Sequence, residues 1–333
     1  MQDFEKKYQE KVGVLITNLG SPGNPDTKNL KKYLKQFLSD KRVVDYNRFF
    51  WWLILNVIIL NIRPKKSAKL YESIWTKEGS PLLVNMQGII NKLRQKNKDI
   101  KILLGMRYGK PSIEDALNQF RNENIFKILV LPLYPQAGSP TNSSTFDEIS
   151  RVFNTWPWIP NLRFVNGYHD HVDYISAISN SIKNATSSCD DIEKIIFSFH
   201  GMPIRYLKDG DPYYCFCHKT ARLVSENLGI GEDRYAIAFQ SRFGSEEWLQ
   251  PYIDEEIIRF AENGVRNLHV ISPGFSVDCL ETLEEIKIQY DKLFKKSGGD
   301  KLEYISCLND DDEHIKLINN IINQNISGWG NGN

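Results

Sequence analysis

The sequence predicts an α/β protein built from two similar halves, each with four parallel strands separated by helices. Eight short apolar runs, rich in β-branched and aromatic residues, are typical of strands. Helical patterns separate most of them, as in βαβ units. Motifs that follow strands in the first half recur in the second, which indicates a duplication. The eight runs cover residues 12–17, 101–105, 127–131, 162–165, 194–199, 234–239, 267–271 and 302–305.

Three pairs of motifs relate the two halves to each other. Residues 18–20, followed by Pro22, correspond to residues 199–201, followed by Pro203; residues 105–109 correspond to 240–244, and 130–134 to 271–275. An ancestral duplication of one half explains this order. We therefore expect two domains, one over residues 1–170 and one over residues 171–333.

The first half carries an insertion that contains a markedly apolar segment. Gly20 and Gly105 are 85 positions apart, whereas Gly201 and Gln240 are 39 apart, so the first half has 46 more positions. The apolar run at 49–62 is about 14 residues long and too short to cross a bilayer, which takes about 20. A buried helix is one interpretation. Two adjacent tryptophans between basic flanks also suit a lip, near 48–66, that contacts a membrane surface or covers an apolar ligand.

His200 directly follows a predicted strand, and Gly201 and Pro203 turn the chain after it. The carboxyl ends of strands in a parallel sheet are where ligands bind, so His200 is a candidate for proton transfer or metal coordination. A hydrogen-bonded loop histidine is the alternative.

An acidic helix follows the predicted strand at 267–271. Asp278, Glu281 and Glu285 are three and four positions apart, which predicts that they share one helical face. Like charges on one face raise one another's pKa unless a cation or a proton lies among them. A solvated acidic helix start, favoured by the helix dipole, is the alternative interpretation.

Composition excludes several classes of function. Among 333 residues, 42 Lys and Arg balance 41 Asp and Glu, and a net charge of +1 predicts no binding of nucleic acid. Residues 1–11 are charged, with no apolar core, so we expect no secretory signal and a cytoplasmic protein. The five scattered cysteines predict no disulfide framework. Cys215 and Cys217 form a weak metal signal, because a tetrahedral site needs four ligands.

At the level of motifs the chain resembles the ferrochelatases, a family of lyases that insert Fe(II) into a porphyrin. The resemblance extends from Gly13 to about Tyr290 and implies two Rossmann-like domains with the porphyrin in the cleft between them. The motifs that carry it are Asn18-Leu19-Gly20-Ser21-Pro22, Gly79-Ser80-Pro81-Leu82, Gly105-Met106-Arg107-Tyr108, Leu133-Tyr134-Pro135-Gln136, the His200 turn, Phe239-Gln240-Ser241-Arg242-Phe243-Gly244 with Trp248, and the Glu281 helix.

The resemblance also implies roles for single residues. It assigns His200 and Glu281 as the pair that contacts the metal and accepts the pyrrole protons, without deciding which residue does which. Asp278 and Glu285 would relay protons or draw the cation inward. Imidazole and carboxylate suit Fe(II), which accepts N and O ligands. The residues that match porphyrin-binding positions are Leu19, Arg107, Tyr134, Trp248 and Phe275.

Departures from the family pattern concern cofactors. Members with a [2Fe-2S] cluster have one cysteine near the position of Ser139 and three more in a C-terminal extension, whereas this sequence has no cysteine after Cys307. The resemblance therefore implies Fe(II) as substrate and no cluster. Cys279 stands where some members have a second histidine, so a relay around Glu281 would run through carboxylates.

Three alternatives stay open at this stage. The implied reaction, the last step of heme biosynthesis, takes protoporphyrin IX; coproporphyrin III would be the rival substrate, and the apolar lip favours the less charged ring. A cobalt chelatase of the same fold would need a basic cleft for its many carboxylates. A two-domain protein that binds a small ligand would also have duplicated halves, but it gives the acidic residues no role. The sequence does not define the oligomeric state.

Overall fold

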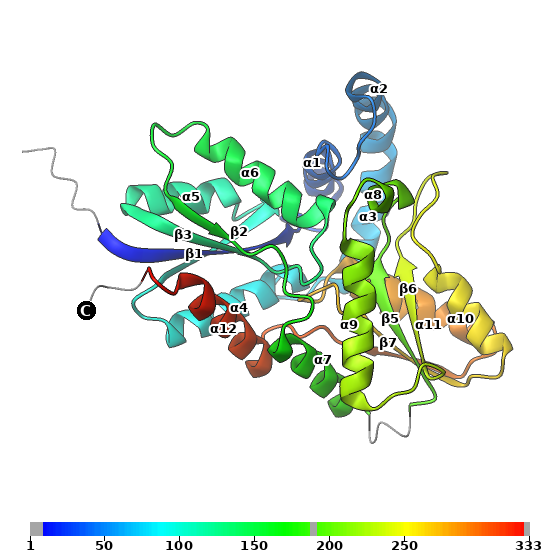
Figure 1. Ribbon diagram of the computed structural model, residues 1–333. Coiled ribbons are helices and arrows are strands. Elements are labelled where there is room, and N and C mark those ends of the chain that lie inside the picture. The colour runs from blue at the N-terminus through cyan, green and yellow to red at the C-terminus, as the bar shows by residue number, and fades with distance from the viewer. Residues whose placement is uncertain (1–8, 187–191, 330–333) are drawn as a thin grey trace, which may run out of the picture. The chain divides into compact units, whose positions relative to one another are not determined.

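A computed structural model describes residues 9–186 and 192–329 and contains two parallel sheets of four strands (Figure 1). The strand orders are β2-β1-β3-β4 and β6-β5-β7-β8. Each predicted apolar run lies within or overlaps one strand, so the predicted fold class is confirmed. The strands are β1 Gln9–Gly20, β2 Lys101–Tyr108, β3 Ile125–Pro132, β4 Asn161–Phe164, β5 Lys194–His200, β6 Tyr235–Gln240, β7 Asn267–Ile271 and β8 Lys301–Ile305.

The two sheets have the same topology. In each, the first strand of the set is bordered by the second and the third, and the fourth is at the edge. This equivalence agrees with the motif pairs: Leu19 and Gly20 end β1 as His200 ends β5. The turn residues of both halves therefore lie at the carboxyl ends of their sheets, where ligands of parallel sheets bind.

The chain forms two compact units, and each has helices on both faces of its sheet. The first unit comprises residues up to 133, 139–167 and from 315 onward, and the second comprises 134–138 and 168–314. In the first unit, α5 (Ile113–Asn122) and α6 (Ser144–Phe153) cover one face, and their apolar side chains pack against Leu15, Ile128 and Val130. Figure 1 shows α4 (Pro81–Lys96) and α12 (Asp312–Ile326) on the other face.

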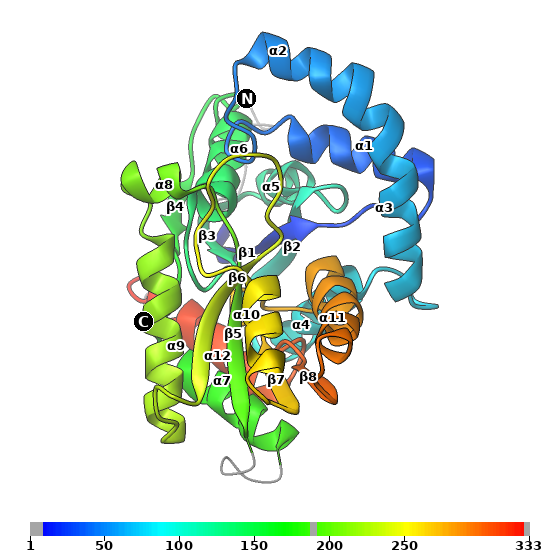
Figure 2. The same cartoon turned by 90° about the vertical axis from the view of Figure 1, so that its right-hand side faces the viewer.

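In the second unit, α7 (Val172–Ala185) and α9 (Tyr213–Leu228) lie against one face of the sheet (Figures 1 and 2). The other face is covered by α10 (Ile253–Glu262), η4 (Glu281–Tyr290) and α11 (Asp291–Lys296). Ile257, Phe260, Ile286 and Phe294 of these helices join the buried cluster around β7. A short helix, α8 (Ile204–Lys208), follows the β5 turn.

The compact units differ from the two predicted domains at the C-terminal end. The prediction places everything after residue 170 in the second domain, whereas residues from 315 onward contact the first unit. Polar contacts hold this segment there: the Asn97 amide donates to Asn319 Oδ1 over 2.8 Å, and the Arg163 guanidinium donates to the carbonyl oxygen of Ser327 over 2.8 Å. These contacts join residues far apart in sequence, so a boundary drawn by strand counting misses them.

The insertion folds as helices. After α1 (Thr27–Leu38), the segments α2 (Arg48–Leu53), η1 (Ile54–Ile59, a π-helix) and α3 (Leu60–Ile74) continue one into the next (Figure 2). The expected lip has two sides. Trp51 belongs to a buried cluster with Leu34, Leu38 and Leu55, whereas Trp52 is exposed. Treating both tryptophans as lip residues is therefore wrong for Trp51. No helix of the described chain is long and apolar enough to span a bilayer.

Candidate active site

His200 is the last residue of β5 and is half-buried, after a run of five buried residues. Gly201 follows because a side chain would not fit: a Cβ there would lie 2.9 Å from the carbonyl oxygen of Gln240 and 3.0 Å from the Trp248 ring. The close approach lets Gly201 donate its backbone N-H to the Gln240 carbonyl over 2.8 Å. The turn thus ends the strand and presents the imidazole at the carboxyl edge of the sheet.

The contacts of the His200 ring decide which nitrogen is basic. Nδ1 lies 2.7 Å from the carbonyl oxygen of Gly201. A carbonyl oxygen only accepts, so Nδ1 carries the proton in the neutral ring and Nε2 keeps its lone pair. The Tyr213 hydroxyl donates to the His200 carbonyl over 3.0 Å, and the Phe275 ring centre is 6.5 Å away. Nε2 is therefore the atom that can take a proton or bind a metal.

The acidic segment does not form the single regular helix face that its spacing predicts. The helix begins at Glu281, so Asp278 precedes it, and residues Glu281–Tyr290 form a π-helix. The wider turn of a π-helix, with its i to i+5 hydrogen bonds, alters which side chains align. The expectation of one shared helical face is therefore wrong for Asp278, which lies before the helix, whereas Glu281 and Glu285 both lie within it.

Asp278 is 6% exposed, and its carboxylate is fully engaged by neighbouring side chains. It accepts hydrogen bonds from the Tyr304 hydroxyl at 2.6 Å, the Asn309 amide at 2.7 Å and the Thr282 hydroxyl at 3.1 Å. Its backbone N-H donates to Asn309 Oδ1 over 2.8 Å. The carboxylate thus joins the start of η4 to β8 and the loop after it.

Glu285 has a separate set of partners. Its carboxylate accepts from the backbone N-H of Ser241 at 2.9 Å, from the Ser241 hydroxyl at 2.5 Å and from the Tyr290 hydroxyl at 3.0 Å. In the described chain, no three His, Cys, Asp or Glu side chains are grouped as a metal site. The geometry therefore separates Asp278 and Glu285 as two anchors of the acidic segment.

Glu281 lies between these anchors and is half-buried. Its carboxylate is hydrogen-bonded by the thiol of Cys279. Burial raises the pKa of Cys279 well above its ordinary value, and the neighbouring Glu281 charge raises it further, so the thiol stays protonated and acts as the donor. Cys279 thus supplies a neutral hydrogen bond at the position where an imidazole would supply a titratable one.

Gln240 connects the two principal candidates. It ends β6 beside β5, where its pairing partner in the sheet is His200. Its side-chain amide donates to the backbone carbonyl of Glu281 over 3.0 Å. His200 and Glu281, 81 positions apart, are thereby connected through one residue at the carboxyl edge of the second sheet.

The predicted ring-binding residues have contrasting environments. Trp248 is 5% exposed, with its ring centre 4.9 Å from that of Phe243, and Tyr134 is 8% exposed. Phe275 is half-buried near His200. These three belong to the second unit, and Leu19 and Arg107 belong to the first. Leu19 packs against the cluster that contains Tyr108 and Trp51.

Arg107 is not an open cation. Its guanidinium donates to Asp40 Oδ2 over 2.5 Å and to the Ser144 hydroxyl over 2.8 Å, and it lies 3.7 Å from the Glu148 carboxylate. Burial alone would raise the pKa of the Asp40 carboxyl, but hydrogen bonds from Ser144 and from the backbone of Arg42, with the charge of Arg107, together lower it. Arg107 therefore stabilises a buried carboxylate within the first unit.

Four residues that contact the candidate site have no role predicted from the sequence: Gln240 and Ser241, which belong to a motif of the resemblance, and Tyr304 and Asn309, which do not. One signal was available for Gln240, because it follows an apolar strand in the motif that matches the end of β2. Tyr304 and Asn309 offered no such signal, since their partner Asp278 lies 26 and 31 positions away.

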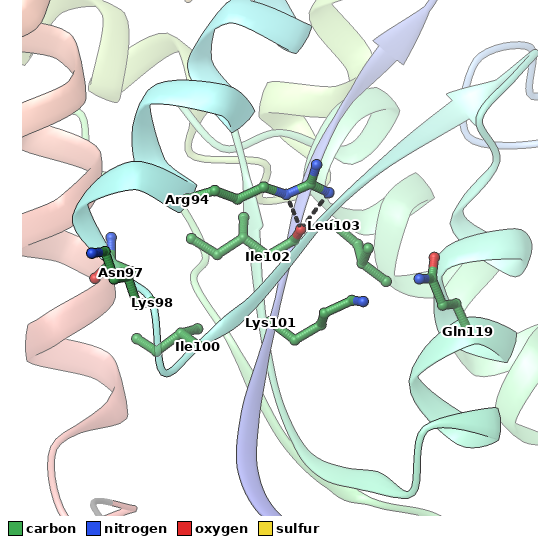
Figure 3. A pocket seen from close by; sticks show the side chains of 8 residues that line it. All are labelled: Arg94, Asn97, Lys98, Ile100, Lys101, Ile102, Leu103 and Gln119. Atoms are coloured by element: carbon green, nitrogen blue, oxygen red, sulfur yellow. Dashed lines mark hydrogen bonds between the residues drawn. The ribbon is translucent and has the colours of Figure 1, made fainter.

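A surface hollow lies at the opposite end of the first sheet from its turn residues. Its volume is about 420 Å³, and Arg94, Lys98, Lys101 and Gln119 are among the residues around it (Figure 3). Figure 3 shows the Arg94 guanidinium directed at the Ile102 carbonyl oxygen, which it contacts at 2.7 and 2.9 Å. Lys101 pairs with Glu123 at 2.8 Å. Arg94 and Lys101 are thus engaged within the protein, and the hollow adds nothing to the candidate site.

Comparison with known proteins gives the family of the chain. A family model described as ferrochelatase matches residues 11–326. A ferrochelatase of Pseudoalteromonas atlantica is 47% identical, over 98% of this chain and 92% of its own length. Ferrochelatase 2 of Shewanella oneidensis is 46% identical, over 94% and 97%.

Solved structures show the same architecture. SirB from Bacillus subtilis, determined with Fe3+, superimposes with a TM-score of 0.61 at 12% identity and covers 96% of each chain. DR2241 from Deinococcus radiodurans, described as similar to chelatases, superimposes with a TM-score of 0.51 at 10% identity, over 97% of this chain and 56% of its own. At such identities the likeness concerns the fold, which is that of the chelatases.

Proposed function

The chain belongs to the ferrochelatase family, metal-inserting enzymes of heme synthesis, and we propose that it inserts Fe(II) into protoporphyrin IX to form protoheme. The observation that carries the proposal is the link from His200 through Gln240 to Glu281, which holds an imidazole and a carboxylate at one sheet edge. Insertion requires removal of two pyrrole protons and delivery of Fe(II), and these two groups can perform both tasks.

His200 and Glu281 are proposed as the residues that meet the metal and take the protons. The contact of Nδ1 with the Gly201 carbonyl leaves Nε2 as the basic atom of the neutral imidazole. The neutral Cys279 thiol is a hydrogen-bond donor to the Glu281 carboxylate. The hydrogen bonds around Asp278 and Glu285 support a role in holding this segment, and their share in proton transfer stays a prediction.

The porphyrin ring would contact apolar and aromatic side chains. Trp248 and Phe275 flank the His200 turn, and they support binding of a flat apolar ring next to the imidazole. Tyr134 and Leu19 are proposed as ring contacts by their family positions. The Arg107 guanidinium is already paired with the Asp40 carboxylate. We therefore propose that Arg107 affects ring binding indirectly, by holding Asp40 in place.

Contact with the membrane surface is the second part of the proposal. Six apolar side chains of the insertion, which we call the apolar ridge, are between 51 and 69% exposed. They are Phe49, Phe50, Trp52, Val57, Ile58 and Ile62. The basic residues Lys65 and Lys66 follow them and are exposed. Exposed apolar groups beside basic ones favour the interface of an anionic bilayer, so we propose a cytoplasmic protein that binds the membrane peripherally.

An insertion assay tests the function. Purified protein is incubated anaerobically with Fe(II) and either protoporphyrin IX or coproporphyrin III, and loss of free-base fluorescence is followed. Faster turnover of protoporphyrin supports the proposal. Faster turnover of coproporphyrin would keep the reaction type and change the substrate. No insertion of Fe(II) into either ring, with insertion of cobalt into a more carboxylated macrocycle, would contradict the proposed function.

Absorption spectra test the cofactor expectation. Cys217, Cys279 and Cys307 are buried free thiols, and burial raises the pKa of each. Such thiols are poor thiolate ligands. We propose that iron enters this protein only as substrate, so the purified protein should be colourless and should contain no stoichiometric acid-labile sulfide.

A further inference from the structure

Gln240, at the carboxyl end of β6, and Ser241, which follows it, contact both the His200 strand and the acidic segment. Gln240 is 1% exposed and uses both ends of its side-chain amide. Its Oε1 accepts from the Ser198 hydroxyl over 2.7 Å, two residues before His200, and its Nε2 donates to the Glu281 carbonyl over 3.0 Å. Its backbone carbonyl accepts from Gly201. One residue thus binds the His200 strand on one side and the Glu281 helix on the other.

Ser241 adds a second clamp and adopts an unusual backbone conformation to do so. Its φ of +66° lies in the left-handed region, which non-glycine residues rarely occupy. In this conformation both its N-H and its hydroxyl point at the Glu285 carboxylate, at 2.9 and 2.5 Å. Strained backbone of this kind persists where the surrounding structure imposes it, often at functional sites.

We infer that Gln240 and Ser241 are positioning residues for metal insertion: they hold the first turn of η4 against the His200 strand, so that Glu281 keeps a fixed place relative to the imidazole. The inference rests on the proposed function of that pair. Two features favour it over a purely structural role. The Gln240 amide has its donor and its acceptor committed to different elements, and the Ser241 strain is accompanied by two hydrogen bonds to one carboxylate. Neither feature contributes to the apolar core.

Two substitutions of Ser241 separate positioning from stability. Ser241→Gly removes the hydroxyl but accepts the left-handed conformation without strain. Ser241→Thr keeps the hydroxyl, but a β-branched residue at this φ is strained. We expect the Gly variant to melt at or above the wild-type temperature with a kcat lowered about 10- to 100-fold, the range seen for residues that orient a metal site. The Thr variant should melt lower and keep kcat within about threefold.

A matched pair tests Gln240. Gln136 is a comparably buried glutamine of the same unit, with hydrogen bonds to Tyr174 and Thr220 and none to His200 or the acidic segment. Each of the variants Gln240→Met and Gln136→Met loses at least two hydrogen bonds, so each should have a lower melting temperature than the wild type. Only Gln240→Met should lose kcat about 10- to 100-fold while the KM for protoporphyrin stays within about twofold.

The outcomes distinguish the inference from the function on which it rests. An inactive wild-type protein would contradict the proposed function and the inference with it. If the wild type is active, either of two results would overturn the positioning role alone. One is a fully active Ser241→Gly variant, and the other is a Ser241→Thr variant as slow as Ser241→Gly. Equal loss of kcat in Gln240→Met and Gln136→Met would do the same.

Discussion

Trp51 and Trp52 are adjacent in sequence and have opposite environments. The Trp51 side chain is 9% exposed and its Nε1 donates to the Leu38 carbonyl oxygen over 2.7 Å, whereas Trp52 is 59% exposed. Consecutive helical residues point in directions about 100° apart, so one ring enters the cluster around Leu34 and Leu38 and the other joins the apolar ridge. Substitution of Trp52 therefore tests the insertion as an exposed lip, and substitution of Trp51 tests it as a buried helix.

Trp52→Ser should weaken liposome association and raise the apparent KM for protoporphyrin, with little change in melting temperature. The exposed ring contributes up to about 25 cal/mol per Å² of apolar contact at a membrane or ligand surface. Trp51→Ser is the matched control and should lose about 3–5 kcal/mol of stability through the cavity it leaves. Unchanged liposome binding and KM for Trp52→Ser would refute the lip.

His200→Ala should abolish metal insertion and leave porphyrin binding largely intact. The role proposed for the imidazole is proton transfer and metal contact, and removal of such a group typically lowers the rate about 10²- to 10⁴-fold. Insertion kinetics and fluorescence titration with protoporphyrin measure the two effects. Turnover within a few-fold of wild type would exclude His200 from the chemistry.

Glu281→Gln keeps the shape of the side chain and removes its charge. We expect strongly reduced turnover and a melting temperature close to that of wild type, because the half-buried side chain retains an acceptor for the Cys279 thiol. The pH-rate profile should also change, since the variant lacks one of the two groups proposed to accept the pyrrole protons. A normal rate with an unchanged profile would show that Glu281 is only part of a solvated helix start.

Asp278→Asn separates anchoring from proton relay. The amide cannot accept from the Tyr304, Asn309 and Thr282 donors as the carboxylate does, so we expect a loss of about 1–3 kcal/mol of stability. At a temperature where the variant is folded, anchoring predicts a modest loss of kcat and a pH-rate profile like that of wild type. A large loss of kcat in a stably folded variant would instead support the relay.

His314 predicts a specific loss of stability in acid. It is 1% exposed, and burial lowers its pKa from 6.5 to about 4. Below pH 6.5 the unfolded chain binds a proton that the folded chain takes up only near pH 4, so stability falls as the pH drops through this window. The shift corresponds to about 3 kcal/mol.

His314→Gln keeps a donor for the Asn309 carbonyl oxygen, which lies 2.6 Å from Nδ1 in the wild type, and removes the titration. Denaturant unfolding between pH 4 and 7 should show a flatter dependence for this variant. Equal slopes for the two proteins would contradict the prediction. His169, His218 and His269, whose pKa values burial also lowers, remain in both proteins.

The sequence alone determined the fold class, the duplication and the position of His200. Strand character depends on local runs of β-branched and aromatic residues, and a Gly with a Pro two residues later ends a strand wherever it occurs. The same local patterns occur in both halves, so the equivalence of the β1 and β5 turns was visible without a structure. The resemblance of ordered motifs then pointed to His200 and Glu281.

The tertiary structure determined which groups each polar or aromatic side chain contacts. Arg107 pairs with Asp40, Asp278 with Tyr304 and Asn309, and these partners lie 26 to 67 positions away. The acidic helix starts at Glu281 and is a π-helix, which no local pattern predicted, and its segment is hydrogen-bonded to Gln240 of β6 and Tyr304 of β8. Hydrogen bonds and burial are set by neighbours in space, so the roles of Trp51, Arg107 and Asp278 required the folded chain.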